Sequence, residues 1–337
     1  MKKIIKMLIL IAVVITALAI VVFCYFFVGK VPQQKNITWG VNFLQMTSES
    51  LKLDWRKNYL AILEDLNVKN IKLMTNWDFI EDKKGEYYFN EIDWQVSEAE
   101  KHGAKLIYVV GMKTGRWPEC HIPSWAKGLS KEEQQKEILK YIKEVILRYK
   151  DQPAITAWQV ENEPLFVFGL CPWYDESFLR KEVELVKSLD NTRPVIVSDS
   201  GELSSWFNVA RIGDIVGTTM YRKSWVKVTG EVGFYGTFPI DPVFYWRKAL
   251  LLEKLFNKKV ICVELQAEPW AQRPFYDVPV KEQEKTMNIA QFKENVEYAK
   301  NTGLDTFYLW GAEWWYWMKE KQDRPEIWNE AKKLFNN

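Results

Sequence analysis

The chain has 337 residues, 47% hydrophobic and 27% charged, which suffices for one large domain with a sizeable core and argues against disorder. Its net charge is +2, and after residue 35 the chain carries 41 basic against 44 acidic residues, so it lacks the basic surplus of a nucleic-acid binder. Two histidines and four cysteines without Cys-x-x-Cys spacing argue against a zinc site. No metal or organic cofactor is therefore expected.

The N-terminal segment predicts a membrane anchor. Three lysines precede an apolar run over residues 7–28, which is long enough to cross a bilayer and longer than the apolar core of a secretory signal. We expect residues 1–29 to form an uncleaved transmembrane signal anchor; the alternative is secretion after cleavage. The excess of lysine before the span places the N-terminus inside and the rest of the chain outside the cytoplasm.

After a polar linker at 30–36, residues 37–337 alternate short apolar strands with amphipathic helices. The expected strands are 37–42, 70–75, 104–111, 155–162, 195–198, 215–221, 259–264 and 306–311. The expected helices lie near 50–66, 91–102, 131–149, 175–189, 202–211, 242–257, 281–301 and 325–335. Eight such units predict an α/β fold, a (β/α)8 TIM barrel preceded by the N-terminal transmembrane signal-anchor helix. A doubly wound sheet is the alternative, but the chain lacks its glycine-rich phosphate motifs.

Two of the expected strands end in carboxylates. The fourth leads into Trp-Gln-Val-Glu-Asn-Glu-Pro at 158–164, and the seventh runs Val-Ile-Cys-Val-Glu at 260–264. In a barrel, side chains at the C-terminal ends of the strands face the mouth, where the chemistry takes place. Two carboxyls facing one another across a cleft are what hydrolysis of a glycosidic bond requires.

These motifs resemble clan A glycoside hydrolases, namely family 5 cellulase-like enzymes with similarity to family 42. The resemblance covers about residues 37–320. Family 5 enzymes retain the anomeric configuration, so the resemblance implies Glu163 as acid/base and Glu264 as nucleophile. It also implies that Asn162 hydrogen-bonds the 2-hydroxyl of the sugar.

The same resemblance implies further substrate contacts. Tyr221, at the end of the sixth strand, matches a tyrosine beside the nucleophile. Trp310, at the end of the eighth, matches the indole floor of the sugar subsite, and the peptide after it is expected to be cis. Lys72 stands on the second strand where family 5 has an arginine, so the positive charge is kept but the bidentate fork is lost.

Four more side chains near strand ends are candidate substrate contacts. Trp77 offers a stacking face, although loop packing explains it equally well. His121 is the one histidine candidate for the sugar site, since His102 precedes a glycine and is expected to end a helix. Glu268, four residues past the seventh strand, is a rival nucleophile or a hydroxyl ligand, and Glu313 is a second hydroxyl ligand.

A disulfide is expected between Cys120 and Cys171. The two cysteines lie in the loops after the third and fourth strands, and adjacent strands place these loops side by side at one face. A compartment outside the cytoplasm permits the bond. Cys262, within the seventh strand, is expected to stay unpaired.

The sequence therefore predicts a monomeric retaining glycosidase, anchored in the membrane, that cleaves β-linked oligo- or polysaccharides outside the cytoplasm. A transglycosidase is the nearest variant, because a sugar acceptor can capture the same glycosyl-enzyme. The alternative from a different class is a non-catalytic, membrane-anchored barrel that binds glycan. The sugar, the linkage and endo or exo action do not follow from these residues.

Overall fold

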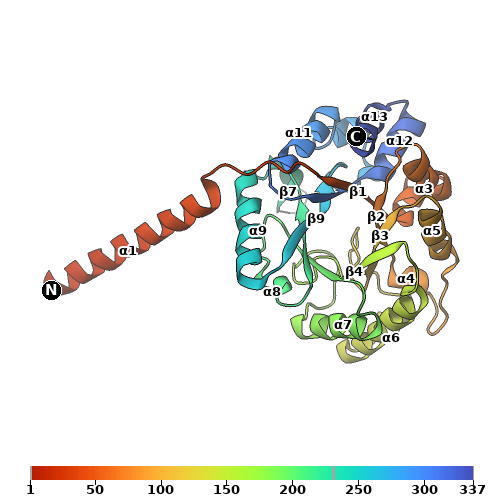
Figure 1. Cartoon of the computed structure of the whole chain (residues 1–337), viewed down its shortest axis with the longest axis horizontal. Helices are drawn as coiled ribbons and strands as arrows, with labels where there is room; N and C mark the ends of the chain where they lie inside the picture. The colour runs from red at the N-terminus through yellow and green to blue at the C-terminus, as the bar shows by residue number, and fades with distance from the viewer. Residues whose placement is uncertain (1, 230–231, 337) are drawn as a thin grey trace.

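A computed structural model of the chain describes residues 2–229 and 232–336, and it contains a closed barrel of eight parallel strands (Figure 1). The strands follow round the barrel in the order β1-β10-β9-β6-β5-β4-β3-β2. They are β1 (Thr38–Phe43), β2 (Asn70–Met74), β3 (Lys105–Val110), β4 (Ile155–Val160), β5 (Val195–Asp199), β6 (Ile215–Met220), β9 (Lys259–Gln266) and β10 (Thr306–Trp310). All eight expected strands are present, and the TIM barrel prediction is confirmed.

Helices form the outer ring of the barrel. The long ones are α3 (Trp55–Glu64), α5 (Asn90–Lys101), α6 (Lys131–Tyr149), α7 (Glu176–Leu189), α9 (Pro242–Phe256), α11 (Ile289–Lys300), α12 (Ala312–Gln322) and α13 (Glu326–Phe335). Local sequence sets several of their ends. Ser130 and Glu133 form a capping box at the start of α6, Asp241 caps α9 ahead of Pro242, and His102 ends α5 as expected.

Short elements lie between these helices, and some of them depart from the expected pattern. They are α2 (Gln45–Ser50), α4 (Trp77–Ile80), α8 (Phe207–Ala210), α10 (Val280–Gln283), and the 3-10 turns at Ser124–Ala126 and Phe275–Asp277. The expected helix 202–211 shrinks to α8 because Trp206 adopts a left-handed conformation, with φ of 69°, and is fully buried. The expected helix 281–301 is split, because Asn288 caps a new helix, α11.

A two-stranded hairpin after β6 is absent from the sequence prediction. Its strands, β7 (Lys223–Thr229) and β8 (Val232–Thr237), pair with each other and not with the barrel. Because a two-stranded ribbon is stabilised mainly by its own cross-strand pairs, neither strand stands out as a buried apolar run.

The N-terminal helix α1 (Lys2–Phe27) projects away from the barrel and is a candidate signal anchor (Figure 1). Residues 3–27 are long and apolar enough to cross a membrane, and none of the most apolar stretch is buried in the protein. Its last turn contacts α9: Phe27 stacks on Phe244 with 5.4 Å between ring centres, and the Arg247 guanidinium lies 5.1 Å from the ring of Tyr25.

The inside of the barrel is filled with side chains, so it is a packed core and not a channel. A middle layer is followed, toward the C-terminal ends of the strands, by a small cluster beneath the mouth. The first comprises Ile107, Ala157, Ile196, Ile261, Val263 and Tyr308; the second comprises Leu44, Met74, Val109 and Trp310. The polar groups described next stand on this apolar support.

Candidate active site

A bulge in β9 turns Glu264 into the barrel mouth. Ile261 and Val263 point into the barrel, and strict alternation would send Glu264 outward. The register against β6 shifts between Cys262 and Glu264, and Leu265 joins the outer core. The extra residue therefore reverses the alternation at Glu264, as β-bulges do. The strand itself continues to Gln266, two residues beyond its expected end.

Glu163 follows β4 in a tight turn. Both Glu161 and Glu163 have left-handed backbones, with φ of 57° and 46°. The amide of Glu163 donates to Ser198 Oγ at 2.9 Å, which fixes this turn against the end of β5. Side chains rarely adopt such conformations outside constrained sites, so the packing around this turn holds Glu163 in place.

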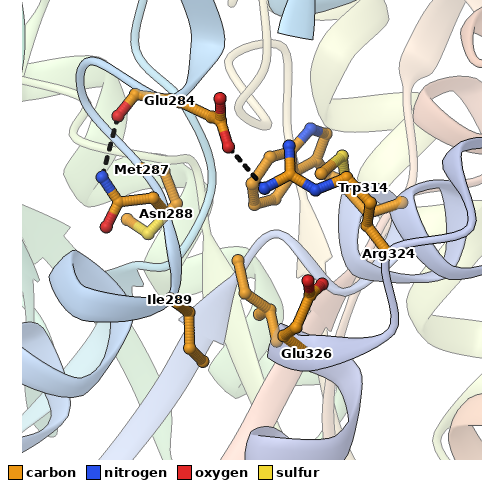
Figure 2. Close-up of a pocket in the computed structure, with 9 residues that line it drawn as sticks. Glu284, Met287, Asn288, Ile289, Trp314, Arg324 and Glu326 are labelled. Atoms are coloured by element: carbon orange, nitrogen blue, oxygen red, sulfur yellow. Dashed lines mark hydrogen bonds and ion pairs between the residues drawn. The ribbon is translucent and has the colours of Figure 1, made fainter. Parts of the chain in front are cut away.

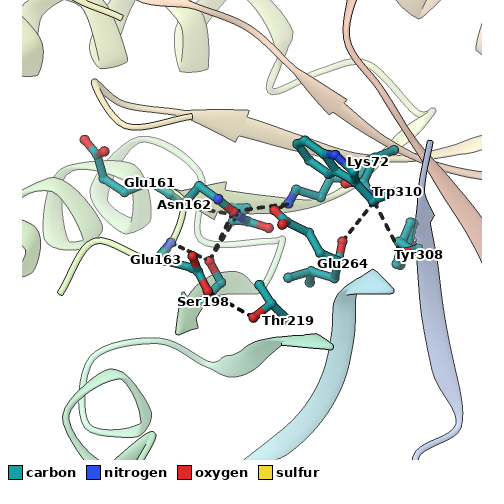
Figure 3. A network of polar contacts seen from close by, with 12 residues as sticks. Lys72, Glu161, Asn162, Glu163, Ser198, Thr219, Glu264, Tyr308 and Trp310 are labelled. Carbon is teal, nitrogen blue, oxygen red and sulfur yellow. Dashed lines mark hydrogen bonds and ion pairs between the residues drawn. The ribbon is translucent and has the colours of Figure 1, made fainter. Parts of the chain in front are cut away.

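Each carboxyl oxygen of Glu264 accepts a hydrogen bond. Lys72 Nζ, which lies beside Glu264 in Figure 3, donates to Oε1 at 3.0 Å. Tyr221 Oη donates to Oε2 at 2.8 Å. Burial, followed by the negative charges of Glu264 and Glu163, raises the pKa of Tyr221, so its hydroxyl keeps the proton that it donates. Lys72 also donates to Asn162 Oδ1 at 3.3 Å and is fully buried. Glu264 thus lies between a lysine and a tyrosine that both donate to it.

Glu163 has the opposite environment. Burial, and next the negative charge of Glu264, raise the pKa of its carboxyl well above the usual range. Thr219 Oγ1 donates to Glu163 Oε1 at 3.0 Å, and Thr219 is also the β6 neighbour of Glu264 in the sheet. The two carboxyls therefore lie in one buried network but in different surroundings, since two side chains donate to Glu264 whereas the pKa of Glu163 is raised.

Trp310 closes the other side of the network. Its Nε1 donates to Glu268 Oε1 at 2.8 Å, and Glu268 forms a two-bond ion pair with Arg116. The expected cis peptide after Trp310 is wrong: within the described residues the only cis bond precedes Pro118. Gly311, with φ of 139°, makes the sharp turn out of β10 instead.

Glu313 lies at the base of the same region. Its Oε1 accepts the Leu44 amide at 2.6 Å, and burial raises the pKa of the carboxyl to about 7. It is 2% exposed, so it supports the β1 loop as the structure stands.

Two of the candidate substrate contacts have structural roles. Trp77 is fully buried, donates to Glu81 Oε2 at 2.7 Å and packs edge-on against Trp125, which favours the loop-packing interpretation over a stacking face. His121 is 1% exposed, and its Nε2 lies 3.0 Å from the Gly115 carbonyl oxygen, so its ring joins two parts of the loop after β3.

The structure also contains the expected disulfide. Cys120 and Cys171 are bonded with 5.2 Å between their Cα atoms, joining the loops after β3 and β4, and Cys262 is free and buried. Within the described residues, no group of three or more histidine, cysteine or acidic side chains is placed to hold a metal ion.

The sequence analysis did not single out three candidate functional residues, Lys113, Arg116 and Glu119, which all lie in the loop after β3. Lys113 links this loop to the loop after β4, because its Nζ donates to the carbonyl oxygens of Glu163 and Phe166. Burial raises the pKa of Glu119 to about 7, and the Glu264 charge acts in the same direction. The sequence feature that could have drawn attention to these three residues is the group of charged side chains between residues 113 and 121, but these do not directly follow a strand end.

Two cavities lie away from the network of Glu163 and Glu264. One lies among α10 to α13 and is bordered by the ion pair of Arg324 with Glu284 (Figure 2). Another lies beneath the disulfide and is lined by Glu161, Glu182 and Lys113 among others.

Comparison with known proteins agrees with the resemblance to clan A glycoside hydrolases. Residues 40–177 match the model of "Glycosyl hydrolase family 10". A curated relative, "Probable mannan endo-1,4-beta-mannosidase A-2" of Aspergillus terreus, is 34% identical over 122 residues, which are 33% of this chain and 29% of that protein. The chain thus matches less than a third of the length of the first curated relatives.

Solved structures show the same fold. The endo-β-1,4-mannanase of Thermotoga petrophila superposes with a TM-score of 0.57 at 17% identity, over 90% of this chain and 78% of that one. Xylanase 10B of Thermotoga maritima gives 0.55 at 15% identity, over 89% and 95%. At these identities the likeness establishes the barrel, and the chemistry has to be argued from the site.

Proposed function

We propose that the chain is a retaining glycoside hydrolase that cleaves β-linked glycans, with Glu264 as nucleophile and Glu163 as acid/base. The observation that carries the proposal is the pair of carboxyls buried in one network with different partners: Glu264 accepts hydrogen bonds from Lys72 and Tyr221, whereas Glu163 has a raised pKa. A binding barrel without catalysis has no need of this difference.

In the first step, Glu163 gives its proton to the glycosidic oxygen while Glu264 attacks the anomeric carbon. The bond to the leaving group breaks, and an ester to Glu264 forms. Lys72 and Tyr221 hold the attacking carboxylate in position through their hydrogen bonds. Asn162 Oδ1 is already engaged by Lys72, so its amide nitrogen is the group that meets the sugar 2-hydroxyl.

In the second step, Glu163 acts as a base. Esterification removes the charge of Glu264, the second largest cause of the raised pKa of Glu163, so the pKa falls when a base is needed. Glu163 then takes a proton from water, the water oxygen attacks the anomeric carbon, and Glu264 leaves as carboxylate. For a retaining enzyme, we expect about 5–5.5 Å between the two carboxyl groups.

The substrate is proposed from the comparisons. The curated relative is named for action on β-1,4-mannan, and one structural neighbour is a xylanase. β-1,4-Mannan is therefore our first candidate substrate, and β-xylan is the second.

The test uses the full chain in detergent with aryl β-glycosides and with both polysaccharides. Glu264→Ala should abolish turnover, and azide should restore it with an inverted product. Glu163→Ala should slow poor leaving groups far more than activated aryl ones. Glu137→Gln, a buried carboxylate of the outer wall paired with Lys140, is the matched control and should keep parental rates. Full activity in Glu264→Ala would overturn the assignment and favour Glu268 as nucleophile.

We further propose that residues 1–29 anchor the barrel, residues 37–337, outside the cytoplasm. The support is the exposed apolar helix α1 together with the disulfide, which an oxidising compartment permits. The chain should stay with membranes after an alkaline wash, and protease added to intact cells should reach the barrel. Release of a shortened chain into the medium would show signal cleavage instead.

A further inference from the structure

Glu163, Glu264 and Trp310, at the mouth of the barrel, expose only 8%, 3% and 5% of their surface. A sugar ring that stacks on the Trp310 indole needs one face of that indole to be free. The side chains considered next come from the loops after β3, β4 and β9.

Arg116 covers Trp310. Its guanidinium carbon lies 4.9 Å from the centre of the Trp310 ring, within the range of a cation–π contact, and 5.4 Å from the ring of Phe275. Beneath the mouth, Trp310 packs with Met74 and Val109. The guanidinium therefore stands where a sugar ring would stack on the indole.

An ion pair holds Arg116 in this position. Both terminal nitrogens bind Glu268, Nη2 at 3.0 Å from Oε2, and the side chains are only 13% and 6% exposed. Arg116 follows β3 and Glu268 follows β9, and these strands are four places apart in the eight-stranded barrel. The pair thus spans the full width of the mouth.

Aromatic contacts form a second bridge over the same gap. Phe168, in the loop after β4, lies 6.0 Å from Trp270 in the loop after β9, and Trp270 packs edge-on against Tyr221 at 4.8 Å. The disulfide and the bond from the Leu170 amide to the Pro118 carbonyl oxygen tie the loops after β3 and β4 together. The loops after β3 and β4 therefore form one connected unit. The Arg116–Glu268 pair and the Phe168–Trp270 contact both join this unit to the loop after β9.

We propose that Arg116 is a gate: its pair with Glu268 closes the mouth of the free protein, and an entering glycan replaces the guanidinium on Trp310 with a sugar ring. The buried Nε of Arg116 has no hydrogen-bond partner among the described residues, so closure leaves one donor unsatisfied and opening removes that cost. The identity of the entering ligand rests on the proposed function, whereas the gate itself does not.

The experiment measures access to Glu163 without any substrate. The full chain is treated with a water-soluble carbodiimide and glycine ethyl ester, and labelling of the peptide that contains Glu163 is followed by mass spectrometry. The double variant Arg116→Gln/Glu268→Gln removes both charges and so leaves no unpaired ion. Arg324→Gln/Glu284→Gln removes the matched pair beside the cavity of Figure 2 and is the control.

We expect labelling of Glu163 to speed up about tenfold or more in the gate variant and to stay at the parental rate in the control, since the rate follows the open fraction. In a protein that turns over glycans, the apparent KM should fall by a similar factor. An unchanged labelling rate, or an equal rise in the control, would overturn the gate. Faster labelling in a protein that cleaves no glycan would leave the gate standing and refute the proposed function. Should the double variant fail to fold, Arg116→Lys keeps the charge without the fork and should give a smaller rise.

Discussion

Replacing Lys72 tests how far the hydrogen-bond network around Glu264 and Asn162 depends on this one buried cation. It is fully buried, 3.0 Å from Glu264 Oε1 and 3.3 Å from Asn162 Oδ1, so Lys72→Met removes both bonds with little change in volume. At an effective dielectric constant of 20, two unit charges 3 Å apart attract by about 5–6 kcal/mol, an upper bound for the pair. Removing one partner of a buried ion pair typically costs about 3–5 kcal/mol, because the remaining charge is left without compensation.

We therefore expect Lys72→Met to lower the unfolding free energy by about 3–5 kcal/mol, which is a fall in Tm of several degrees in a domain of this size. The decisive measurement is a double-mutant cycle by calorimetry with Glu264→Gln. In the double variant no charge is unpaired, so it should be more stable than the sum of the single effects predicts by about 1–3 kcal/mol. Additivity within about 0.5 kcal/mol would refute the coupling. Turnover of Lys72→Met should fall by about 10–100-fold, the worth of one charge-assisted bond to the proposed nucleophile, Glu264.

The remaining predictions concern stability. Replacing Cys120 and Cys171 by serine reopens a loop with a sequence separation of 51, which should cost about 4 kcal/mol by chain entropy and lower Tm; an unchanged Tm would show that the reduced chain is already constrained. Burial raises the pKa of Glu119 and Glu313 from 4.5 to about 7, so their neutral forms stabilise the fold below about pH 4.5, and this stability is lost as the pH rises through 7. Replacing both by Gln should therefore flatten the fall in Tm between about pH 5 and 8, and parallel pH curves would contradict it. Burial and the Glu161 charge raise the pKa of Glu182 well above its usual range. The Tm of Glu182→Gln should therefore equal the parental Tm at acid pH and exceed it at alkaline pH. A lower Tm of the variant at both pH values would show that Glu182 is ionised in the folded protein.

The barrel could be predicted because its strands are buried on both sides. Such strands read as continuous apolar runs, and all eight lie where the runs are. The β7–β8 hairpin has no such run, and α12 is so rich in tryptophan that its sequence lacks an amphipathic stripe. The hydrophobic periodicity of the sequence therefore missed two kinds of segment: a hairpin stabilised by its own cross-strand pairs, and a helix buried by neighbours on all sides.

The site shows a similar division. Carboxylates after strand ends pointed to Glu163 and Glu264, and the resemblance to clan A glycoside hydrolases pointed to Tyr221. The β-bulge that turns Glu264 inward leaves no mark in the sequence, since it depends on the register with β6. The sequence analysis also did not identify Arg116, because its contact is with Glu268, which lies 152 residues away in the sequence and on the far side of the barrel. For Trp77 the sequence left stacking and packing open, because position after a strand does not say which way a side chain turns.

The contact of α1 with α9 has a consequence for where the protein can work. Phe27 packs on Phe244, and the linker that follows is bound to the barrel, since Gln33 and Gln34 donate to Asn301 and to the Gly303 carbonyl oxygen. In a chain held in a bilayer by α1, these contacts keep the barrel close to the membrane surface, because the segment between them is bound to the barrel and is not a free linker. Under the proposed function, a glycan therefore has to come to the membrane surface to be cleaved.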